Sequence, residues 1–413
     1  VNALAEAILE LVENDALRHK LGEEATRRSF RTWRQYAEDI LDEMRSYKPK
    51  PSIRSTVAAV SKMQGKGTPS PRLSICVTTY NRAPWLRVSL ENLFRRVRPW
   101  RDVVEIVVCD NASTDSTPDV VKPYLGENNF RYYRNEINVG MLGNLRVTAH
   151  HSRGQYVWIL GDDDLIRQGA VEQILRAIDQ HPAIGLMYLN YSYTRISEAA
   201  EVDNIDQFLL DATPIVPPTP NQFAAIKQIS TFSENFFTAI YCLVFRRDHA
   251  LRAYSQNTSG RPFSSLLTCI PTSYYICENM FDEMGYWIGE PFVVVNMNVS
   301  WGRFAPLWIL ERIPELYDLA EKMGADPDAV DGWRRYTLGS AIHYLERIFF
   351  NDPEGNATYF SMDRWIARHK HLEEFRLKLP EALRIYDRAY RLGVAGVSES
   401  PEQLFAKYGL LDR

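Results

Sequence analysis

The chain has 413 residues, of which 45% are hydrophobic, 12% aromatic and 24% charged, and its formal net charge is −4. These proportions are typical of globular proteins and exclude an intrinsically disordered chain. Basic and acidic residues nearly balance, at 48 against 52, so we predict no nucleic-acid partner. No apolar run reaches the ~20 residues of a membrane span. The five cysteines are too scattered for a zinc site or a disulfide framework.

Four regions follow one another along the chain. Residues 1–48 carry an apolar stripe at helical spacing and are predicted to form a helical extension. Residues 49–71 are rich in proline, glycine and small polar residues, which is typical of a linker. Residues 72–303 alternate short apolar strands with amphipathic helices, and residues 304–413 are mostly helical. We therefore predict a central α/β domain between two helical regions.

The central region begins with a strand and a helix, and this alternation continues. We predict strands at Leu73–Thr78, Val103–Cys109, Arg131–Arg134 and Gln155–Leu160. The helices that follow them are predicted at Pro84–Val97, Thr117–Tyr124, Leu142–His150 and Ala170–His181. Further strand-like segments occur at Ile184–Asn190, Ala239–Phe245 and Pro291–Val299. Such alternation favours a doubly wound, mainly parallel sheet, in which ligands bind beyond the carboxyl ends of the strands.

The strongest local feature is the acidic sequence Gly161-Asp162-Asp163-Asp164, directly after an apolar strand. Adjacent carboxylates raise each other's pKa unless a cation compensates their charge. Hard oxygen ligands of this kind suit Mg²⁺ or Mn²⁺. The alternative interpretation is a solvated acidic turn before the helix that starts near Ala170.

Two other strand ends carry polar side chains in the same topological position. The loop Asp110-Asn111-Ala112-Ser113-Thr114-Asp115 offers a carboxylate that can accept a hydrogen bond from a base or a ribose hydroxyl. Its alternative interpretation is a cluster of helix-capping and turn residues. The segment Thr78-Thr79-Tyr80-Asn81-Arg82 offers hydroxyls, an aromatic face and a cation, and the helix that opens near Pro84 adds a positive dipole end suited to phosphate.

Together with Asn138-Val139-Gly140, these motifs resemble the signature of glycosyltransferase family 2, in the order and at the spacing of that family. The resemblance covers residues 73–180. It implies a GT-A fold and metal-dependent transfer of a sugar, with inversion, from a UDP, GDP or dTDP donor. The implied acceptor is the hydroxyl of a glycan or a lipid-linked glycan, in bacterial surface polysaccharide synthesis. The implied location is the cytoplasm or the inner face of the membrane.

The resemblance also implies roles for individual residues. The nucleoside would be held by Thr78, Tyr80, Arg82 and Asp110, and the donor pocket would be lined by Asn138, Gly140 and Asn144. Asp162 would face the ribose or the donor sugar. Asp163 is the first choice for the ligand of Mn²⁺ or Mg²⁺, and Asp164 is the second.

The catalytic base is harder to assign. Many relatives carry it in a Glu-Asp pair that opens the helix before the last core strand, but here that helix begins with Pro271-Thr272-Ser273-Tyr274. We predict Glu278 as the base, with Asp282, Glu283 and Glu234 as alternatives. The missing pair also leaves open a catalytically silent GT-A module that binds glycan or scaffolds a polysaccharide synthase complex.

Residues 1–46 resemble the closing helices of GT-B glycosyltransferases, through the run Leu4-Ala5-Glu6-Ala7-Ile8-Leu9-Glu10 and the later Trp33 and Tyr36. This similarity implies a GT-B module as a partner on the same longer chain. The alternative is a simple helical extension that packs on the catalytic domain or pairs subunits.

Overall fold

The computed structural model describes residue 14 and residues 70–233, 238–298 and 301–410. The chain divides into two units, residues 1–68 and 69–413, and nearly all of the described residues belong to the second. The predicted helical extension with its GT-B-like segment, nearly all of the linker, and Glu234 lie outside the described residues. Within the described ranges, no helix is both long enough and apolar enough to cross a membrane.

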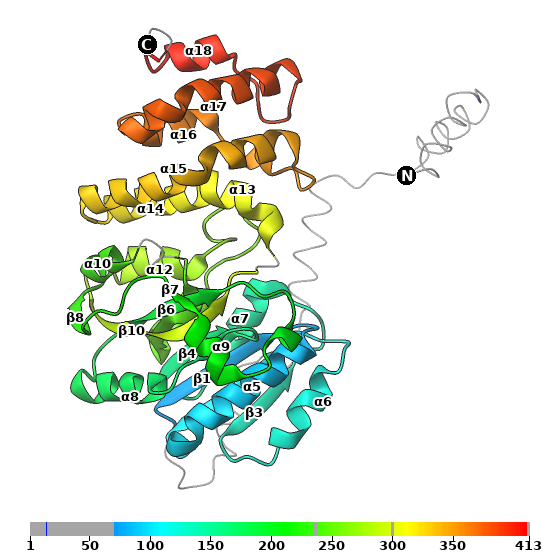
Figure 1. The fold of residues 1–413 in the computed structure, drawn as a ribbon, viewed down its shortest axis with the longest axis vertical. Coiled ribbons are helices and arrows are strands. Elements are labelled where there is room, and N and C mark those ends of the chain that lie inside the picture. The colour runs from blue at the N-terminus through cyan, green and yellow to red at the C-terminus, as the bar shows by residue number, and fades with distance from the viewer. Residues whose placement is uncertain (1–13, 15–69, 234–237, 299–300, 411–413) are drawn as a thin grey trace, which may run out of the picture. The chain divides into compact units, whose positions relative to one another are not determined.

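The core of the second unit is a mixed sheet with the strand order β3-β2-β1-β4-β9-β6-β10-β5 (Figure 1). The strands are β1 (Leu73–Thr79), β2 (Val104–Asp110), β3 (Phe130–Arg134), β4 (Tyr156–Gly161), β5 (Leu165–Ile166), β6 (Leu186–Thr194), β7 (Thr213–Pro214), β8 (Gln222–Ala225), β9 (Leu243–Arg246) and β10 (Met284–Asn296). Strands β3, β2, β1 and β4 pair in parallel, and so do β6 and β10. The short strands β5, β7, β8 and β9 pair antiparallel with their neighbours. This architecture confirms the predicted α/β fold with a mixed, mainly parallel sheet.

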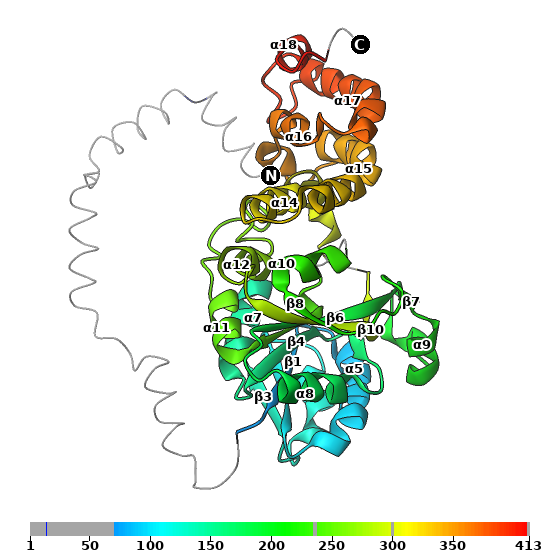
Figure 2. The ribbon, with the colours of Figure 1, turned by 90° about the vertical axis from the view of Figure 1, so that its left-hand side faces the viewer.

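Helices cover both faces of this sheet, which is why its central strands are continuous apolar runs. Figure 2 shows α7 (Gly140–His151) and α11 (Arg247–Tyr254) on one side and α5 (Ala83–Val97) on the other. In α5, Leu86, Leu90 and Leu93 are buried at helical spacing. The other helices of this region are α6 (Thr117–Val121), α8 (Ala170–Gln180), α9 (Ile205–Asp211), α10 (Ile226–Ile229) and α12 (Pro271–Asn279).

The C-terminal part is helical, as predicted, and stacks beyond the sheet in successive layers (Figures 1 and 2). Its helices are α13 (Ala305–Leu307), α14 (Ile313–Lys322), α15 (Pro327–Phe350), α16 (Met362–His369), α17 (Glu373–Arg391) and α18 (Pro401–Ala406). An apolar stripe of α15 is buried and consists of Trp333, Leu338, Ala341, Leu345 and Ile348.

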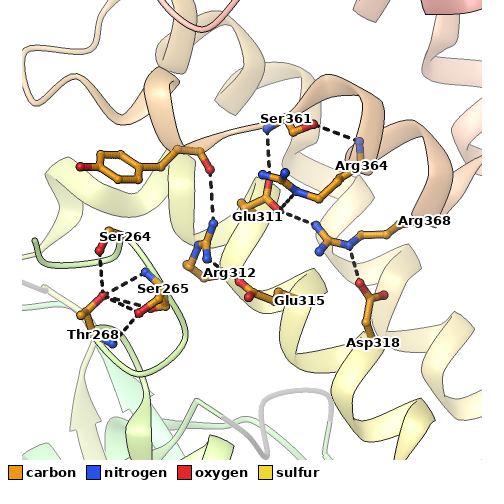
Figure 3. Close-up of polar contacts among 11 residues, drawn as sticks. Ser264, Ser265, Thr268, Glu311, Arg312, Glu315, Asp318, Ser361, Arg364 and Arg368 are labelled. Carbon is orange, nitrogen blue, oxygen red and sulfur yellow. Dashed lines mark hydrogen bonds and ion pairs between the residues drawn. The ribbon is translucent and has the colours of Figure 1, made fainter. Parts of the chain in front are cut away.

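A buried ionic network joins these helices. Glu311 lies in the π-helical turn Trp308–Arg312 and is 1% exposed. Its carboxylate pairs with Arg364 and Arg368 of α16, and Arg368 also contacts Asp318 of α14 (Figure 3). The network therefore fixes α16 against α14 through charged hydrogen bonds as well as through apolar packing.

Candidate functional site

The predicted site residues meet at one edge of the sheet, the carboxyl ends of β1, β2, β3 and β4. The strand register places Thr79 beside Asp110, Thr78 beside Gly161, and Asp110 beside Arg134. The loops that follow these strands are therefore neighbours in space, although their sequences lie tens of residues apart. This is the edge at which open α/β sheets bind ligands.

The acidic triplet folds back over the end of β4. Asp162 is 3% exposed and accepts a hydrogen bond from the Thr79 hydroxyl at 2.7 Å. Asp164 is also buried, and its Oδ2 accepts the backbone N–H of Gly161 at 2.7 Å. An added Cβ at position 161 would lie 3.0 Å from Asp164 Oδ2 and 3.1 Å from Asp163 Oδ1, so both carboxylates would have to shift by a few tenths of an ångström.

Arg82 forms ion pairs with two of the three carboxylates. Its Nη1 lies 2.9 Å from Asp162 Oδ1, and its Nη2 lies 2.8 Å from Asp163 Oδ2. The guanidinium also lies over the ring of Trp85, 5.5 Å from its centroid. Its side chain is 36% exposed, so it stands between the buried carboxylates and solvent.

The triplet retains excess negative charge despite this arginine. Burial, followed by the charge of Asp163 beside it, raises the pKa of Asp164 well above its ordinary value. Burial also raises the pKa of Asp162 to about 7; the charge of Asp163 adds to this rise, and Arg82 opposes it. Hard carboxylate oxygens held close together with unbalanced charge are a donor set that fits Mg²⁺ or Mn²⁺. In the described residues, however, no group of three or more histidine, cysteine or acidic side chains is already arranged around one ion position.

The loop after β1 is fastened to the loop after β2. Asn81 adopts a left-handed backbone conformation with φ 53°, and its N–H donates to Ser113 Oγ at 2.8 Å. The side chain of Asp115 accepts the N–H of Ala83 at 2.9 Å and so caps the first turn of α5. This cap fixes Arg82, the residue before the helix, relative to the sheet edge.

Asp110 lies at the centre of this edge and is completely buried. Its Oδ1 accepts the N–H of Ser113 at 2.8 Å, and its Oδ2 accepts the Tyr132 hydroxyl at 2.7 Å. Arg134 Nε lies 3.4 Å from the same oxygen. Both oxygens therefore already have protein partners. Thr78 is half-buried and Tyr80 is 43% exposed, so the aromatic ring is accessible to a ligand.

An asparagine network holds the loop between β3 and α7. Asn111 donates to Asn138 Oδ1 and to the Gly140 carbonyl, and its own oxygen accepts the Val139 N–H. Asn144 donates to the Cys109 carbonyl at 3.1 Å and accepts from Asn135 at 3.0 Å. Gly140 has a φ of 76°, which favours glycine. The structure thus brings Asn138, Gly140 and Asn144 together at the end of β2.

The predicted base lies in a different setting. Glu278 is exposed near the carboxyl end of α12, where Tyr274 donates to it. Among the residues predicted as alternative bases, Asp282 forms an ion pair with Lys227, and Glu283 lies 3.4 Å from Nε2 of His249.

Thr79, Asn111 and Asn135 are among the residues that contribute to the site although the sequence analysis assigned them no role. Thr79 follows Thr78 directly, but its hydroxyl reaches Asp162 only because β1 and β4 pair in parallel. Asn111 and Asn135 directly follow the ends of β2 and β3. Their position after a strand end is the sequence feature that could have identified them as site residues.

A family comparison agrees with this geometry. Residues 74–250 match the model described as glycosyl transferase family 2. This part of the chain belongs to glycosyltransferase family 2. The match includes the carboxyl ends of β1, β2, β3 and β4 and stops before α12.

Curated relatives align with only part of the chain. The abequosyltransferase RfbV of Salmonella typhimurium is 31% identical over 116 residues, which cover 28% of this chain and 34% of RfbV. The poly(ribitol-phosphate) beta-N-acetylglucosaminyltransferase TarS of Staphylococcus aureus is 30% identical over 111 residues, which cover 27% of this chain and 19% of TarS. The alignments thus span about a third or less of these relatives.

Solved structures resemble the chain at low sequence identity. A crystal structure of S. aureus TarS 1-349 gives a TM-score of 0.45 at 14% identity, covering 78% of this chain and 83% of that chain. The mannosyltransferase PcManGT from Pyrobaculum calidifontis, in complex with GDP-Man and Mn2+, gives 0.43 at 16% identity, covering 81% and 93%.

Proposed function

We propose that this family 2 domain is a glycosyltransferase that moves a sugar from a nucleoside-diphosphate donor to a hydroxyl of a glycan or a lipid-linked glycan. The observation that carries the proposal is the meeting of Arg82 with the acidic triplet at the carboxyl edge of the sheet. The guanidinium of Arg82 suits the recognition of a diphosphate, and the carboxylates suit a divalent cation that accompanies it. We extend the proposal to bacterial surface polysaccharide synthesis, and to a protein in the cytoplasm or at the inner face of the membrane.

The donor would lie across the ends of β2, β1 and β4. The accessible ring of Tyr80 would contact the nucleoside, near Thr78 and the buried Asp110. Because both oxygens of Asp110 have protein partners, its role would be to position Arg134 and Tyr132. Asn138, Gly140 and Asn144 would shape the pocket through the asparagine network, and Asp162 would face the ribose or the donor sugar.

Asp163 would hold a divalent cation, with Asp164 as a second ligand. When bound, Mn²⁺ or Mg²⁺ would neutralise the charge that develops on the departing diphosphate. The guanidinium N–H groups of Arg82 would donate hydrogen bonds to the same diphosphate oxygens. These donors act where charge increases during the reaction, so they would stabilise the transition state more than the bound donor.

Inverting transfer needs a carboxylate that accepts the acceptor's hydroxyl proton while the hydroxyl oxygen attacks the anomeric carbon opposite the diphosphate. We propose Glu278 for this role. Its exposed position at the far end of α12 specifically favours a second candidate function, a catalytically silent module that binds glycan or scaffolds a synthase complex.

A binding panel tests the donor site, and a turnover assay separates the two candidates. Thermal unfolding would be followed with UDP, GDP, dTDP and CMP, each with Mn²⁺ and with EDTA. A nucleotide present at a hundred times its dissociation constant adds about 2.7 kcal/mol to stability. Metal-dependent stabilisation by one nucleoside diphosphate is expected, and none with any nucleotide would contradict the proposal. Binding without release of nucleoside diphosphate from the matching donor sugars would favour the silent module.

A further inference from the structure

Arg82 occupies the face of the acidic triplet that a divalent cation would need. It bridges Asp162 and Asp163 at 2.9 and 2.8 Å, and its guanidinium is supported by the Trp85 ring. Asp164, the third carboxylate, is satisfied by the backbone of Gly161. In this arrangement the protein supplies its own cation to the carboxylates that we assign to the metal.

A cation alone would bind more weakly to this arrangement than to the same carboxylates without Arg82. It would have to separate Arg82 from Asp163, which breaks a charge-assisted hydrogen bond and leaves two positive groups side by side. A diphosphate alone would also bind poorly, because its negative charge would approach three carboxylates of which two are buried. Each ligand arriving alone therefore meets like charge.

The two ligands together remove both conflicts. Arg82 is 36% exposed, so its guanidinium can rotate away from the carboxylates while its backbone stays fixed by the Asp115 cap at Ala83. A diphosphate then offers it a bidentate anionic partner, and the divalent cation takes over the carboxylates. In that arrangement the negative triplet would face the positive cation, the cation would face the negative diphosphate, and the diphosphate would face the positive Arg82.

We infer that Arg82 is a positioning residue that couples the two ligands: it holds the triplet until a divalent cation and a diphosphate arrive together. The inference rests on the proposed function and adds to it an interdependence of metal and nucleotide. By linkage, nucleotide raises the affinity for the cation by the same factor as the cation raises that for nucleotide.

The test measures free Mn²⁺ by electron paramagnetic resonance in titrations with no nucleotide and with UDP, GDP or dTDP at saturation. For the wild-type chain we expect nucleotide to tighten Mn²⁺ binding at least about 10-fold, within the usual range of coupling. Arg82→Gln should bind Mn²⁺ alone roughly 10-fold more tightly than the wild type, and its coupling factor should fall below the wild-type value, because only the direct attraction between cation and diphosphate remains. Arg82→Lys keeps the charge without the bidentate geometry and should give intermediate values. Arg87→Gln, an exposed position on α5, is the matched control and should behave as the wild type.

Several outcomes would overturn the inference. One is that Arg82→Gln binds Mn²⁺ alone no more tightly than the wild type, and another is that it keeps the full coupling factor. If Arg82→Gln does not fold, as judged by its melting curve, Arg82→Lys decides, and wild-type values in that variant would contradict the inference. Failure of the proposed function gives a different result, because the wild-type chain would then bind no nucleoside diphosphate even with Mn²⁺.

Discussion

Glu311 offers a sharp test of the C-terminal helical region. Its buried carboxylate accepts hydrogen bonds from the Ser361 N–H at 3.1 Å, Arg364 Nε at 2.9 Å and Arg368 Nη1 at 2.8 Å (Figure 3). Burial acts to raise its pKa, but the hydrogen bonds and charges of the two arginines outweigh burial and lower it. Glu311 is therefore ionised at neutral pH. Glu311→Gln keeps the shape and removes the charge that balances both guanidiniums.

Removing one partner of a buried ion pair costs about 3–5 kcal/mol. The lower end applies here, because Arg364 is 53% exposed to water and Arg368 keeps Asp318 as a partner. We expect Glu311→Gln to lose about 3 kcal/mol. At about 2–4 °C per kcal/mol, the melting temperature at neutral pH should fall by roughly 6–12 °C.

The control is Asp387→Asn, which removes an exposed i,i+4 pair with Arg391 and should cost below about 1 kcal/mol. A pH series adds a signature. Because the folded-state pKa of Glu311 is depressed, its contribution is present above the unfolded-state pKa and is lost as the pH falls through the folded-state value. The melting temperatures of the wild type and of Glu311→Gln should therefore converge at acidic pH. A Glu311→Gln melting temperature equal to that of Asp387→Asn would refute the assignment of stability to this network.

Three further predictions concern single side chains. Asp163→Ala should abolish Mn²⁺-dependent nucleotide binding in calorimetry, and undiminished affinity would remove Asp163 as the metal ligand. Glu278→Gln should lower turnover by about a hundredfold or more if Glu278 is the base; near-wild-type rates would move the search to Asp282, Glu283 and Glu234. Burial lowers the pKa of His369 to about 4, and its Nδ1 donates to the Trp365 carbonyl. As the pH falls from about 6.5 towards 4, this histidine takes up a proton in the unfolded chain but not in the folded chain. The protein should therefore lose up to about 3 kcal/mol of stability over this range. His369→Leu should remove that loss in a series of melting curves, and an unchanged pH dependence would contradict the assignment.

The first half of the sheet could be predicted closely from the sequence. The strand predicted at Leu73–Thr78 is β1, Leu73–Thr79, and the helix predicted at Pro84–Val97 is α5, Ala83–Val97. There the apolar runs end abruptly in polar loops, so pattern and structure coincide. The order of these strands also brings their polar loops together, which is why the candidate site could be placed on one edge.

The second half was less predictable because its strands are irregular. The predicted strand Pro291–Val299 is the end of the longer β10, Met284–Asn296, in which a register shift between Ile288 and Val293 accommodates Glu290 and Pro291. Ala239–Phe245 was predicted as a strand, but Ile240–Cys242 is a 3₁₀ turn and only Leu243–Arg246 is β9. Periodicity contains no information about such turns and bulges.

The pairing within the site could not be predicted either. Arg82 and Asp163 are separated by 81 positions, and sequence motifs do not specify where a flexible guanidinium points. The same holds for Asp110, whose carboxylate faces Tyr132 and Ser113 rather than open space. Motif recognition identified the participants, whereas their hydrogen-bond partners needed the fold.

The asparagine network has a consequence for the energetics of donor recognition. Amide-to-backbone hydrogen bonds hold the β3–α7 loop against the end of β2 through Asn111 and Asn144. A ligand that enters a preorganised loop does not bear the entropic cost of ordering it, about 1–2 kcal/mol per residue. Association of the proposed donor with the β3–α7 loop should therefore be fast. The heat-capacity change of binding should reflect only the buried surface of the nucleotide. Asn111→Ala would shift that cost to the binding step, visible as a more unfavourable binding entropy.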